Sequence, residues 1–288
     1  MSSLLPVPPL YPLLYQDLMR RALEEDLGRA GDLTTDSVVP PEAQAQAQLV
    51  ARGAGRIAGL PVALSAFSLL DPTLEIRTFV RDGADVEAGT VLALISGAAR
   101  PILSAERTAL NILGRLSGIA TATWRIVEHI LDLNTEITCT RKTTPCLRAL
   151  EKYAVRVGGG SNHRFGLDDA VLIKDNHLVV AGGLGPAVTR ARAQIGHLVK
   201  IEVEVDTLVQ LDELLSLEVD AVLLDNMDPE TLRQAVAMVD GRMITEASGG
   251  ITPATVRTIA ETGVDMISLG WLTHTVKNFD VALDFQAL

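Results

Sequence analysis

Residues 199–250 decide the fold of this chain; they read VKIEVEVDTLVQLDELLSLEVDAVLLDNMDPETLRQAVAMVDGRMITEASGG. Three runs rich in valine, leucine and isoleucine are separated by two stretches whose apolar residues recur at helical spacing. In chain order these segments cover 199–205, 207–217, 220–224, 229–239 and 243–247. Nearly continuous apolar strands are typical of a parallel sheet covered by helices on both faces, and the alternation of strands with helices predicts such a sheet.

The same alternation extends in both directions from this stretch. The β-rich runs are 137–140, 170–173, 199–205, 220–224, 243–247 and 264–269, and the helical stretches between them include 184–195, 207–217, 229–239 and 253–261. We therefore expect an α/β domain with six parallel strands. The pattern leaves open whether the sheet closes into a barrel. Six strands fall short of the usual eight, so a barrel would be small or incomplete.

The first hundred residues follow a different pattern. Short alternating runs broken by Gly and Pro predict an α+β domain with a mostly antiparallel sheet. Its expected elements are helices at 16–26 and 61–70, a polar loop from Gly28 through Asp36, and strands at 43–51, 74–80 and 91–95, followed by a long helical region at 101–131. We place this N-terminal domain at 1–115 and the domain with the parallel sheet at 116–275. The tail, about 276–288, is a candidate to pack on the first domain.

Composition narrows the class of protein. The 288 residues are 48% hydrophobic and 21% charged, which is typical of a globular chain. The net charge of −11 argues against nucleic acid or an anionic membrane as a general partner. No apolar run approaches the ~18 residues that cross a bilayer. Two cysteines are too few for a disulfide framework.

The N-terminal segment bears on the expected location. Residues 1–15 carry four prolines and no basic residue, unlike a secretion signal. We expect a cytoplasmic protein.

Basic residues are nonetheless concentrated between Arg141 and Lys174. This segment holds seven basic and three acidic residues, together with His163 and a triple glycine. A basic island in an acidic chain suggests a site for a small polyanion. A solvated helix face is the alternative interpretation for three of its members, Arg148, Lys152 and Arg156.

Ionisable or glycine-rich groups follow each of the six predicted strands. In strand order they are Arg141 and Lys142; Lys174, Asp175, Asn176 and His177; Glu202 and Glu204; Asp225 and Asn226; Glu246, Ser248, Gly249 and Gly250; and Gly270, Thr273 and His274. The carboxyl ends of parallel strands are where α/β folds place their active sites. We therefore expect one active site at this edge.

Residues 248–253, SGGITP, have the composition of an anion cradle. The two glycines let backbone N–H groups approach an anion closely. Thr252 as N-cap, with Pro253 in the first turn, would direct a helix N-terminus at the same anion. Gly270 and Thr273 are candidates for the other half of a phosphate site, because the last two loops of a barrel often bind phosphate.

Two separated carboxylates, Glu204 and Asp225, complete the expected constellation. Carboxylates beside bound phosphates are typical of Mg²⁺ sites, and they would also stabilise a carbocation-like centre. The sequence contains no P-loop, G-x-G-x-x-G after a strand, H-E-x-x-H or serine nucleophile elbow. The combination suits transfer of a phosphorylated sugar onto an anionic acceptor.

Several motifs closely resemble those of quinolinate phosphoribosyltransferases. They are EDLG (25–28), ERTALN (106–111), LSGIA (116–120), TRKTTP (140–145), KYAVR (152–156), GGGSNHR (158–164), LIKDNH (172–177) and ASGGI (247–251). The resemblance spans nearly the whole chain. It implies an N-terminal α/β sandwich plus a six-stranded incomplete α/β barrel, assembled as a homo-oligomer, either a dimer or a hexamer. The implied reaction joins quinolinate to phosphoribosyl pyrophosphate with Mg²⁺ and no organic cofactor, giving nicotinate mononucleotide, pyrophosphate and CO₂.

The resemblance also implies a role for each matching residue. Arg107 would reach across from the partner subunit. Four residues would hold the quinolinate carboxylates: Arg141, His163, Arg164 and Lys174. Three would face the sugar pyrophosphate and the metal: Lys142, Glu204 and Asp225. Five would line the 5′-phosphate region: Ser248, Gly249, Gly250, Gly270 and His274.

Two positions depart from the family pattern, and two other functions stay open. Cys146 stands where the family usually has Gly, and Trp271 where it usually has Ala. One alternative is a barrel aldolase that forms a Schiff base on Lys174 or Lys200. The other is a non-catalytic anion-binding relative, or a paralogue associated with molybdenum uptake.

Overall fold

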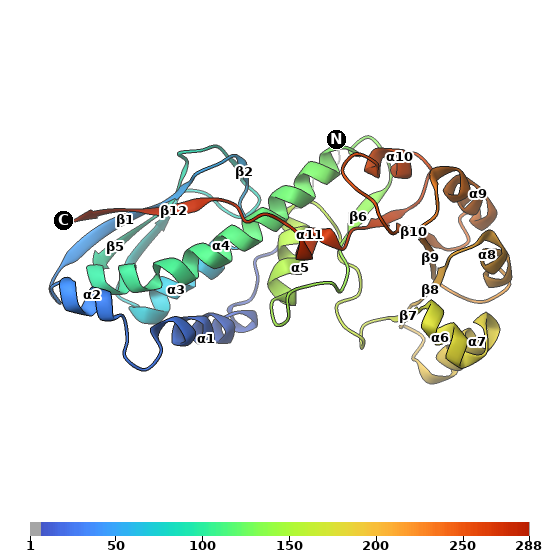
Figure 1. Ribbon diagram of the computed structural model, residues 1–288, viewed down its shortest axis with the longest axis horizontal. Coiled ribbons are helices and arrows are strands. Elements are labelled where there is room, and N and C mark those ends of the chain that lie inside the picture. Colours follow the sequence, from blue (N-terminus) through green and yellow to red (C-terminus); the bar gives the residue numbers. More distant parts are fainter. Residues whose placement is uncertain (1–6, 288) are drawn as a thin grey trace. The chain divides into compact units, whose positions relative to one another are not determined.

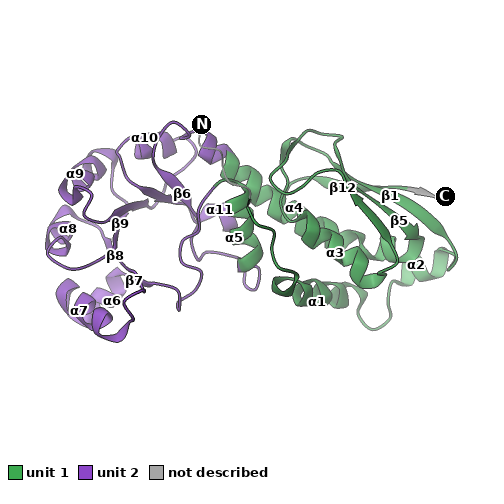
Figure 2. Cartoon of the chain, turned by 180° about the vertical axis from the view of Figure 1, so that it is seen from behind, with its two compact units in different colours: residues 1–124, 149–159, 275–288 green, residues 125–148, 160–274 purple. Residues whose placement is uncertain are grey.

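The computed structural model describes residues 7–287, and its backbone divides into two compact units. Unit 1 comprises residues 1–124, 149–159 and 275–288, and unit 2 comprises 125–148 and 160–274 (Figure 2). The outermost residues of the expected N-terminal domain and tail, 1–6 and 288, lie outside the described residues. Unit 1 thus holds more of the chain than the expected range 1–115, because 116–124 and 149–159 make most of their contacts within it.

Unit 1 is built on a four-stranded antiparallel sheet with the order β12-β1-β5-β3 (Figure 1). Its strands are β1 (Gln44–Ala51), β3 (Glu75–Thr78), β5 (Val91–Ala98) and β12 (Val281–Ala287), and β2 (Gly55–Arg56) pairs with β4 (Asp85–Val86) in a small second sheet. The tail strand β12 pairs with β1 from Ala45↔Ala287 to Ala51↔Val281. The predicted antiparallel sheet is confirmed.

The helices of unit 1 follow from local sequence. They are η1 (Pro12–Leu14), α1 (Gln16–Leu27), α2 (Leu33–Val38), α3 (Leu60–Leu70), α4 (Ala99–Glu128, whose last turn belongs to unit 2) and α5 (Arg148–Val157). The expected polar loop through Asp36 is wrong, because the Asp32 carboxylate accepts from the Thr35 N–H and caps α2. In α4, an added Cβ on Gly114 or Gly118 would meet the backbone of 277–279 within 3 Å, so these glycines permit close packing.

The face of α5 is not solvated as a whole. Lys152 is 1% exposed and Glu151 is fully buried, where Glu151 accepts two hydrogen bonds from Arg115. The alternative of a solvated helix face is therefore wrong for Lys152, which is packed within the protein. Arg156, one turn further on, is exposed.

Unit 2 is a parallel six-stranded sheet with the order β6-β11-β10-β9-β8-β7. Its strands are β6 (Glu136–Thr138), β7 (Val171–Ile173), β8 (Ile201–Val205), β9 (Ala221–Asp225), β10 (Ile244–Ser248) and β11 (Met266–Ser268). All five ladders are parallel. Strands β6 and β7 occupy the two edges, so among the described residues the barrel is open between them. The six predicted strands and the incomplete barrel are confirmed.

Helices cover the outer side of this sheet (Figure 1). They are α6 (Asp175–Ala181), α7 (Leu184–Gln194), α8 (Leu208–Leu214), α9 (Pro229–Val239) and α10 (Val256–Ala260). The short helix α11 (Trp271–His274) follows β11 and contributes Trp271 and His274 to the cavity described below. Two of the covering helices begin at N-cap residues of the types that favour this position. Thr207 caps α8, and Asp228 caps α9 with Pro229 in the first turn. Helix α10 begins later than expected. Within the described residues, no helix is both long enough and apolar enough to span a bilayer.

Candidate active site

A cavity of about 640 Å³ opens at the carboxyl edge of the parallel sheet, entirely within unit 2. Every strand of the sheet, or the loop that follows it, contributes to its wall. The lining residues are Thr140, Arg141, Lys142, His163, Arg164, Leu172, Lys174, Glu204, Leu223, Asp225, Asn226, Glu246, Ser248, Gly249, Gly250, Ile251, Ser268, Leu269, Gly270, Trp271 and His274. The expected convergence at one edge is therefore present.

Strand register explains why acidic side chains enter this cavity. Glu204 pairs in register with Leu223, and Leu223 with Glu246, across the neighbouring strands β8, β9 and β10. Residues in register on a parallel sheet point to the same face. All three line the cavity.

Twelve of the thirteen site residues expected from the sequence line this cavity. The exception is Arg107, an exposed residue of α4 in unit 1. Thr273, expected in the phosphate site, is instead buried behind the wall, where its hydroxyl donates to the Lys142 carbonyl at 2.8 Å. Thr273 thus braces the loop that carries Arg141 and Lys142.

Two arginines give the cavity buried positive charge. The Nε atoms of Arg141 and Arg164 are buried, and neither has a hydrogen-bond partner among the described residues. Arg164 is held by its Nη1, which donates to the Ala170 carbonyl at 2.9 Å. Burial and then the neighbouring Arg141 charge lower the pKa of the Arg164 guanidinium from its ordinary value. Two adjacent guanidiniums with unused donors form a site for an anion with more than one carboxylate.

A lysine and two carboxylates share the wall of the cavity. Lys174 forms an ion pair with Glu204 through Nζ and Oε2. Asp225, at the end of β9, accepts a hydrogen bond from the Asn226 side chain. Burial, followed by the charge of Asp206, raises the pKa of Asp225 above its ordinary value. Glu204 and Asp225 thus offer two carboxylates that a divalent cation would neutralise.

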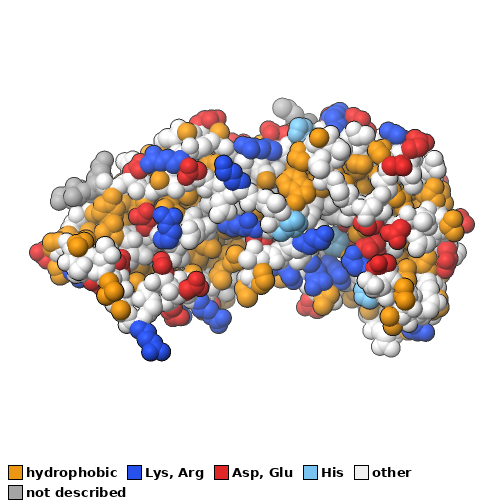
Figure 3. All heavy atoms as spheres, in the orientation of Figure 1, with side chains coloured by type: hydrophobic (Ala, Val, Ile, Leu, Met, Phe, Trp, Pro, Cys, Tyr) orange, Lys and Arg blue, Asp and Glu red, His pale blue; other side chains and the backbone are white. Residues whose placement is uncertain are grey.

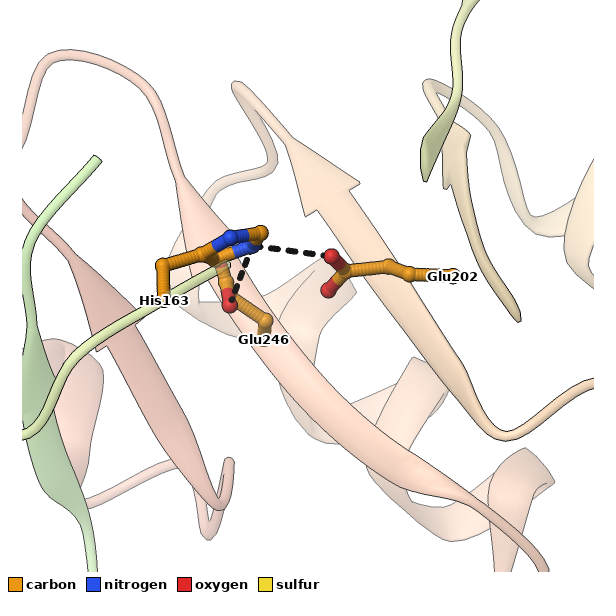
Figure 4. A group of neighbouring side chains, drawn as sticks. All are labelled: His163, Glu202 and Glu246. Atoms are coloured by element: carbon orange, nitrogen blue, oxygen red, sulfur yellow. Dashed lines mark hydrogen bonds and ion pairs between the residues drawn. The ribbon is translucent and has the colours of Figure 1, made fainter. Parts of the chain in front are cut away.

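His163 lies between two glutamates at the cavity wall (Figure 4). Its Nε2 is 2.9 Å from Glu202 Oε2 and 3.5 Å from Glu246 Oε2. Its Nδ1 accepts a hydrogen bond from the Arg164 backbone N–H at 2.8 Å. That donor requires Nδ1 to be unprotonated, so the ring proton lies on Nε2, facing the carboxylates.

The same three side chains have metal-ligand spacing, since their ligand atoms lie within 4.8 Å of one another. A metal on Nε2 would move the ring proton to Nδ1, against the Arg164 N–H. The geometry therefore favours a proton-sharing network over a metal site. The sequence placed Glu202 and Glu246 at strand ends without giving them a role. The alternation of side chains along β8 and β10 was the sequence feature that could have identified them.

The other end of the cavity is formed by glycine turns. Gly249 and Gly250 adopt φ values of +95° and +62°, and a Cβ on Gly249 would lie 2.2 Å from Asn226 Oδ1. The expected helix N-terminus is wrong. Residues 253–255 form a turn, closed by the Thr255 and Val256 N–H groups bonding to the Thr252 carbonyl, and α10 begins at Val256. The expected anion cradle is therefore the glycine turn itself, without a helix N-terminus.

Trp271 joins the two loops at this end. Its Nε1–H donates to the Ile251 carbonyl at 3.0 Å, and the side chain lines the cavity beside Gly270. On the face drawn in Figure 3, Lys and Arg side chains gather beside His side chains near the middle. The charge is thus unevenly placed, as the sequence indicates.

Comparison with known proteins places nearly the whole chain in one family. The model described as "Quinolinate phosphoribosyl transferase, N-terminal domain" matches residues 32–117, and the corresponding C-terminal model matches 119–284. A probable nicotinate-nucleotide pyrophosphorylase [carboxylating] of Bacillus subtilis is 44% identical over 272 residues, covering 94% of this chain and 93% of the relative. A Mycobacterium leprae protein described as nicotinate-nucleotide pyrophosphorylase [carboxylating] is 43% identical over 277 residues, covering 93% and 96%.

A solved structure indicates the same family. The crystal structure of NadC from Streptococcus pyogenes has a TM-score of 0.94 and 38% identity, covering 98% of this chain and 99% of that one. Two domain models and these relatives together span nearly all of the sequence. The chain therefore belongs to the quinolinate phosphoribosyl transferase family.

Proposed function

We propose that this protein transfers the phosphoribosyl group of phosphoribosyl pyrophosphate to the nitrogen of quinolinate and releases pyrophosphate and CO₂. The product is nicotinate mononucleotide, a precursor in NAD biosynthesis. Family membership supports the reaction. The observation that supports this cavity as the place of the reaction is the pair of buried Nε atoms on Arg141 and Arg164, neither of which has a hydrogen-bond partner among the described residues. Quinolinate brings two adjacent carboxylates to such a pair.

The basic end of the cavity binds quinolinate in this proposal. Arg141, Arg164 and Lys174 hold the two carboxylates, which directs the ring nitrogen toward the sugar. His163 contributes by fixing Arg164, because its Nδ1 already accepts the Arg164 N–H and its Nε2–H faces Glu202. Fixing both partners converts an encounter of two molecules into a reaction within one complex.

The opposite end binds the sugar phosphate. The turn at Ser248, Gly249 and Gly250 presents backbone N–H groups to the 5′-phosphate, and Gly270 and His274 lie on the facing loop. Lys142 lines the cavity beside Gly270 and suits the pyrophosphate. Mg²⁺ fits Glu204 and Asp225, directly or through water, since it prefers one or two carboxylates plus phosphate oxygens. When bound, the ion would neutralise the departing pyrophosphate.

The chemistry explains these residue types. As pyrophosphate leaves, positive charge develops on the ribose, and the carboxylates of Glu204 and Asp225 stabilise it. The glycosylated ring is a pyridinium, which accepts the electron pair left when the adjacent carboxylate departs as CO₂. The reaction then needs no organic cofactor.

We further propose that the enzyme works in the cytoplasm as a homo-oligomer in which Arg107 completes a partner's quinolinate site. Arg107 is exposed on α4 and outside the cavity of its own chain as described. Its ERTALN motif resembles that of the family. Mixing an inactive Arg107→Ala subunit with an inactive Lys174→Ala subunit tests this: an Arg107 donated in trans restores activity in the mixed oligomer.

The direct test is incubation with quinolinate, phosphoribosyl pyrophosphate and Mg²⁺, following nicotinate mononucleotide by chromatography. Arg141→Ala and Lys174→Ala should abolish product while the circular dichroism spectrum is unchanged. Lys200→Ala is the matched control, because Lys200 is exposed and pairs with Asp220 outside the cavity. Near-normal turnover in Arg141→Ala would count heavily against the proposal.

The same experiments address the alternatives. The Lys174 ammonium is held by Glu204, which opposes the free amine that a Schiff base requires. Borohydride trapping of a lysine adduct would revive the aldolase. Quinolinate binding by calorimetry without CO₂ release would indicate a non-catalytic relative.

A further inference from the structure

Glu246 is a buried carboxyl group on the cavity wall, and one of its oxygens has no hydrogen-bond partner among the described residues. It belongs to β10, is 4% exposed and lines the cavity. Its Oε2 is 3.5 Å from His163 Nε2, whereas Oε1 is buried without a hydrogen-bond partner among the described residues. A buried oxygen in that state is costly unless it carries a proton or meets a ligand.

The surroundings of Glu246 favour its protonated form. Burial, followed by the charge of Glu202, raises the pKa of Glu246 to about 7, while His163, the Ser268 hydroxyl and Lys174 act in the opposite direction. The His163 proton faces Glu202 at 2.9 Å, and Glu202 itself does not line the cavity. These surroundings favour a protonated Glu246 carboxyl in the cavity wall near neutral pH.

The reaction in the proposed function requires such a proton. When CO₂ leaves the glycosylated ring, the electron pair of the broken carbon–carbon bond stays on the ring carbon beside the nitrogen. That carbon must gain a proton to become the C–H bond of nicotinate mononucleotide. Until it does, CO₂ can add back.

We propose that Glu246 is the general acid that protonates the ring carbon vacated by CO₂. This inference rests on the proposed function and adds a catalytic residue to it. In the step, the carbon–carboxylate bond breaks and its electrons remain on the ring carbon. The Oε1–H bond of Glu246 then breaks, and its proton forms the new C–H bond. Glu246 is left as a carboxylate and takes a proton from water after the products leave.

The other groups around the cavity are poorer donors. The arginines keep their protons at any physiological pH. Lys174 is engaged by Glu204, and the Nε2–H of His163 by Glu202. Glu204 and Asp225 are assigned to the sugar and the metal. An acid that sits beside the quinolinate-binding residues, buried and with its oxygen unpartnered, meets the geometric requirement for a proton donor.

The test separates the two chemical events by measuring pyrophosphate and CO₂ in the same reaction. Wild type should release them in a ratio of one. Glu246→Gln, which keeps the shape but has no acidic proton, should release pyrophosphate at a comparable rate and CO₂ about 100-fold more slowly. The dicarboxylated nucleotide should then accumulate. Glu246→Asp, which keeps an acid on a shorter side chain, should recover part of the CO₂ release.

Glu136→Gln is the matched control, since Glu136 is an exposed residue of β6 in the same sheet. It should leave both rates unchanged. A ratio of one in Glu246→Gln would overturn the proposal. Absence of pyrophosphate release from wild type would instead overturn the proposed function, so the two failures are distinguishable.

A wild-type measurement keeps the inference testable if the variant does not fold. In single turnovers, CO₂ per pyrophosphate should fall as the pH rises above about 7, where Glu246 loses its proton before the step. His163, Glu202, Lys174 and Ser268 are the groups facing it, and Glu246→Asp should shift the fall to another pH. A flat ratio between pH 6 and 9 would refute the assignment.

Discussion

The indole Nε1–H of Trp271 donates a hydrogen bond to the backbone carbonyl of Ile251 at 3.0 Å. This bond fixes the turn at Gly249 and Gly250 to the loop that follows β11. Without the indole, the turn would sample more conformations, and its N–H groups would be less well arranged for a phosphate.

We therefore expect Trp271→Ala to raise the KM for phosphoribosyl pyrophosphate about tenfold, roughly 1.4 kcal/mol, with little change in kcat or in the KM for quinolinate. Trp271→Phe keeps an aromatic ring but loses the donor, and should show most of the effect. Steady-state kinetics with each substrate varied in turn provides the measurement. Equal changes in both KM values would point to general loosening of the cavity instead.

Arg164 is expected to bind a carboxylate through its fork of N–H donors, including the unpartnered Nε. Lysine retains the charge but cannot make two parallel hydrogen bonds. Arg164→Lys should weaken quinolinate binding by 10-fold to 100-fold, about 1.4 to 2.7 kcal/mol, and leave phosphoribosyl pyrophosphate binding unchanged. Calorimetric titration with each ligand checks this. Unaltered quinolinate affinity would contradict the carboxylate role.

Cys146 occupies a position that suits glycine. The Leu147 N–H bonds to the Thr144 carbonyl at 3.1 Å, which closes a turn with Pro145 and Cys146 at its centre. Cys146 has a φ of +66°, in the left-handed region that a side chain disfavours. Cys146→Gly should raise the free energy of unfolding by roughly 1 kcal/mol. Cys146→Ala, which keeps a Cβ, is the control and should have little effect in urea denaturation.

Glu246 should make stability depend on pH. Its folded pKa of about 7 lies above its ordinary value, so the folded state holds this proton more tightly than the unfolded chain. The associated stability is fully present below pH 4.5 and is lost as the pH rises through about 7. The loss from this group should be on the order of 2 kcal/mol. Urea denaturation of wild type at pH 5, 6, 7 and 8 measures it, and Glu246→Gln should flatten the dependence.

Local patterns predicted the parallel sheet and the cavity edge well. Apolar runs of β-branched residues identified all six strands of unit 2, and because the strands are parallel, residues after each strand were expected at one edge. Arg141, Lys174 and Glu204 meet there. Helix α2 was missed, since its sequence LTTDSV has no apolar periodicity and depends on the Asp32 cap.

Other parts of the site could not be derived from periodicity. His163 and Arg164 lie in a loop between α5 and β7; the basic segment from Arg141 to Lys174 indicated an anion site there, but only the resemblance to a family motif assigned these two residues to the quinolinate carboxylates. The helix expected from Pro253 begins only at Val256, after a turn at residues 253–255, and the local pattern did not distinguish that turn from a first helical turn. The burial of Glu246 against His163 depends on contacts between segments some eighty residues apart, which no local pattern encodes.

The position of β12 beside β1 has a consequence for biosynthesis. Strand β1 lies between β5, which follows it closely in sequence, and β12, which is translated more than 220 residues later. On the ribosome, one edge of β1 therefore remains without a partner throughout synthesis of the entire parallel sheet. A nascent chain in this condition exposes a strand that can template aggregation, and it would benefit from a chaperone that shields the edge until β12 has been made.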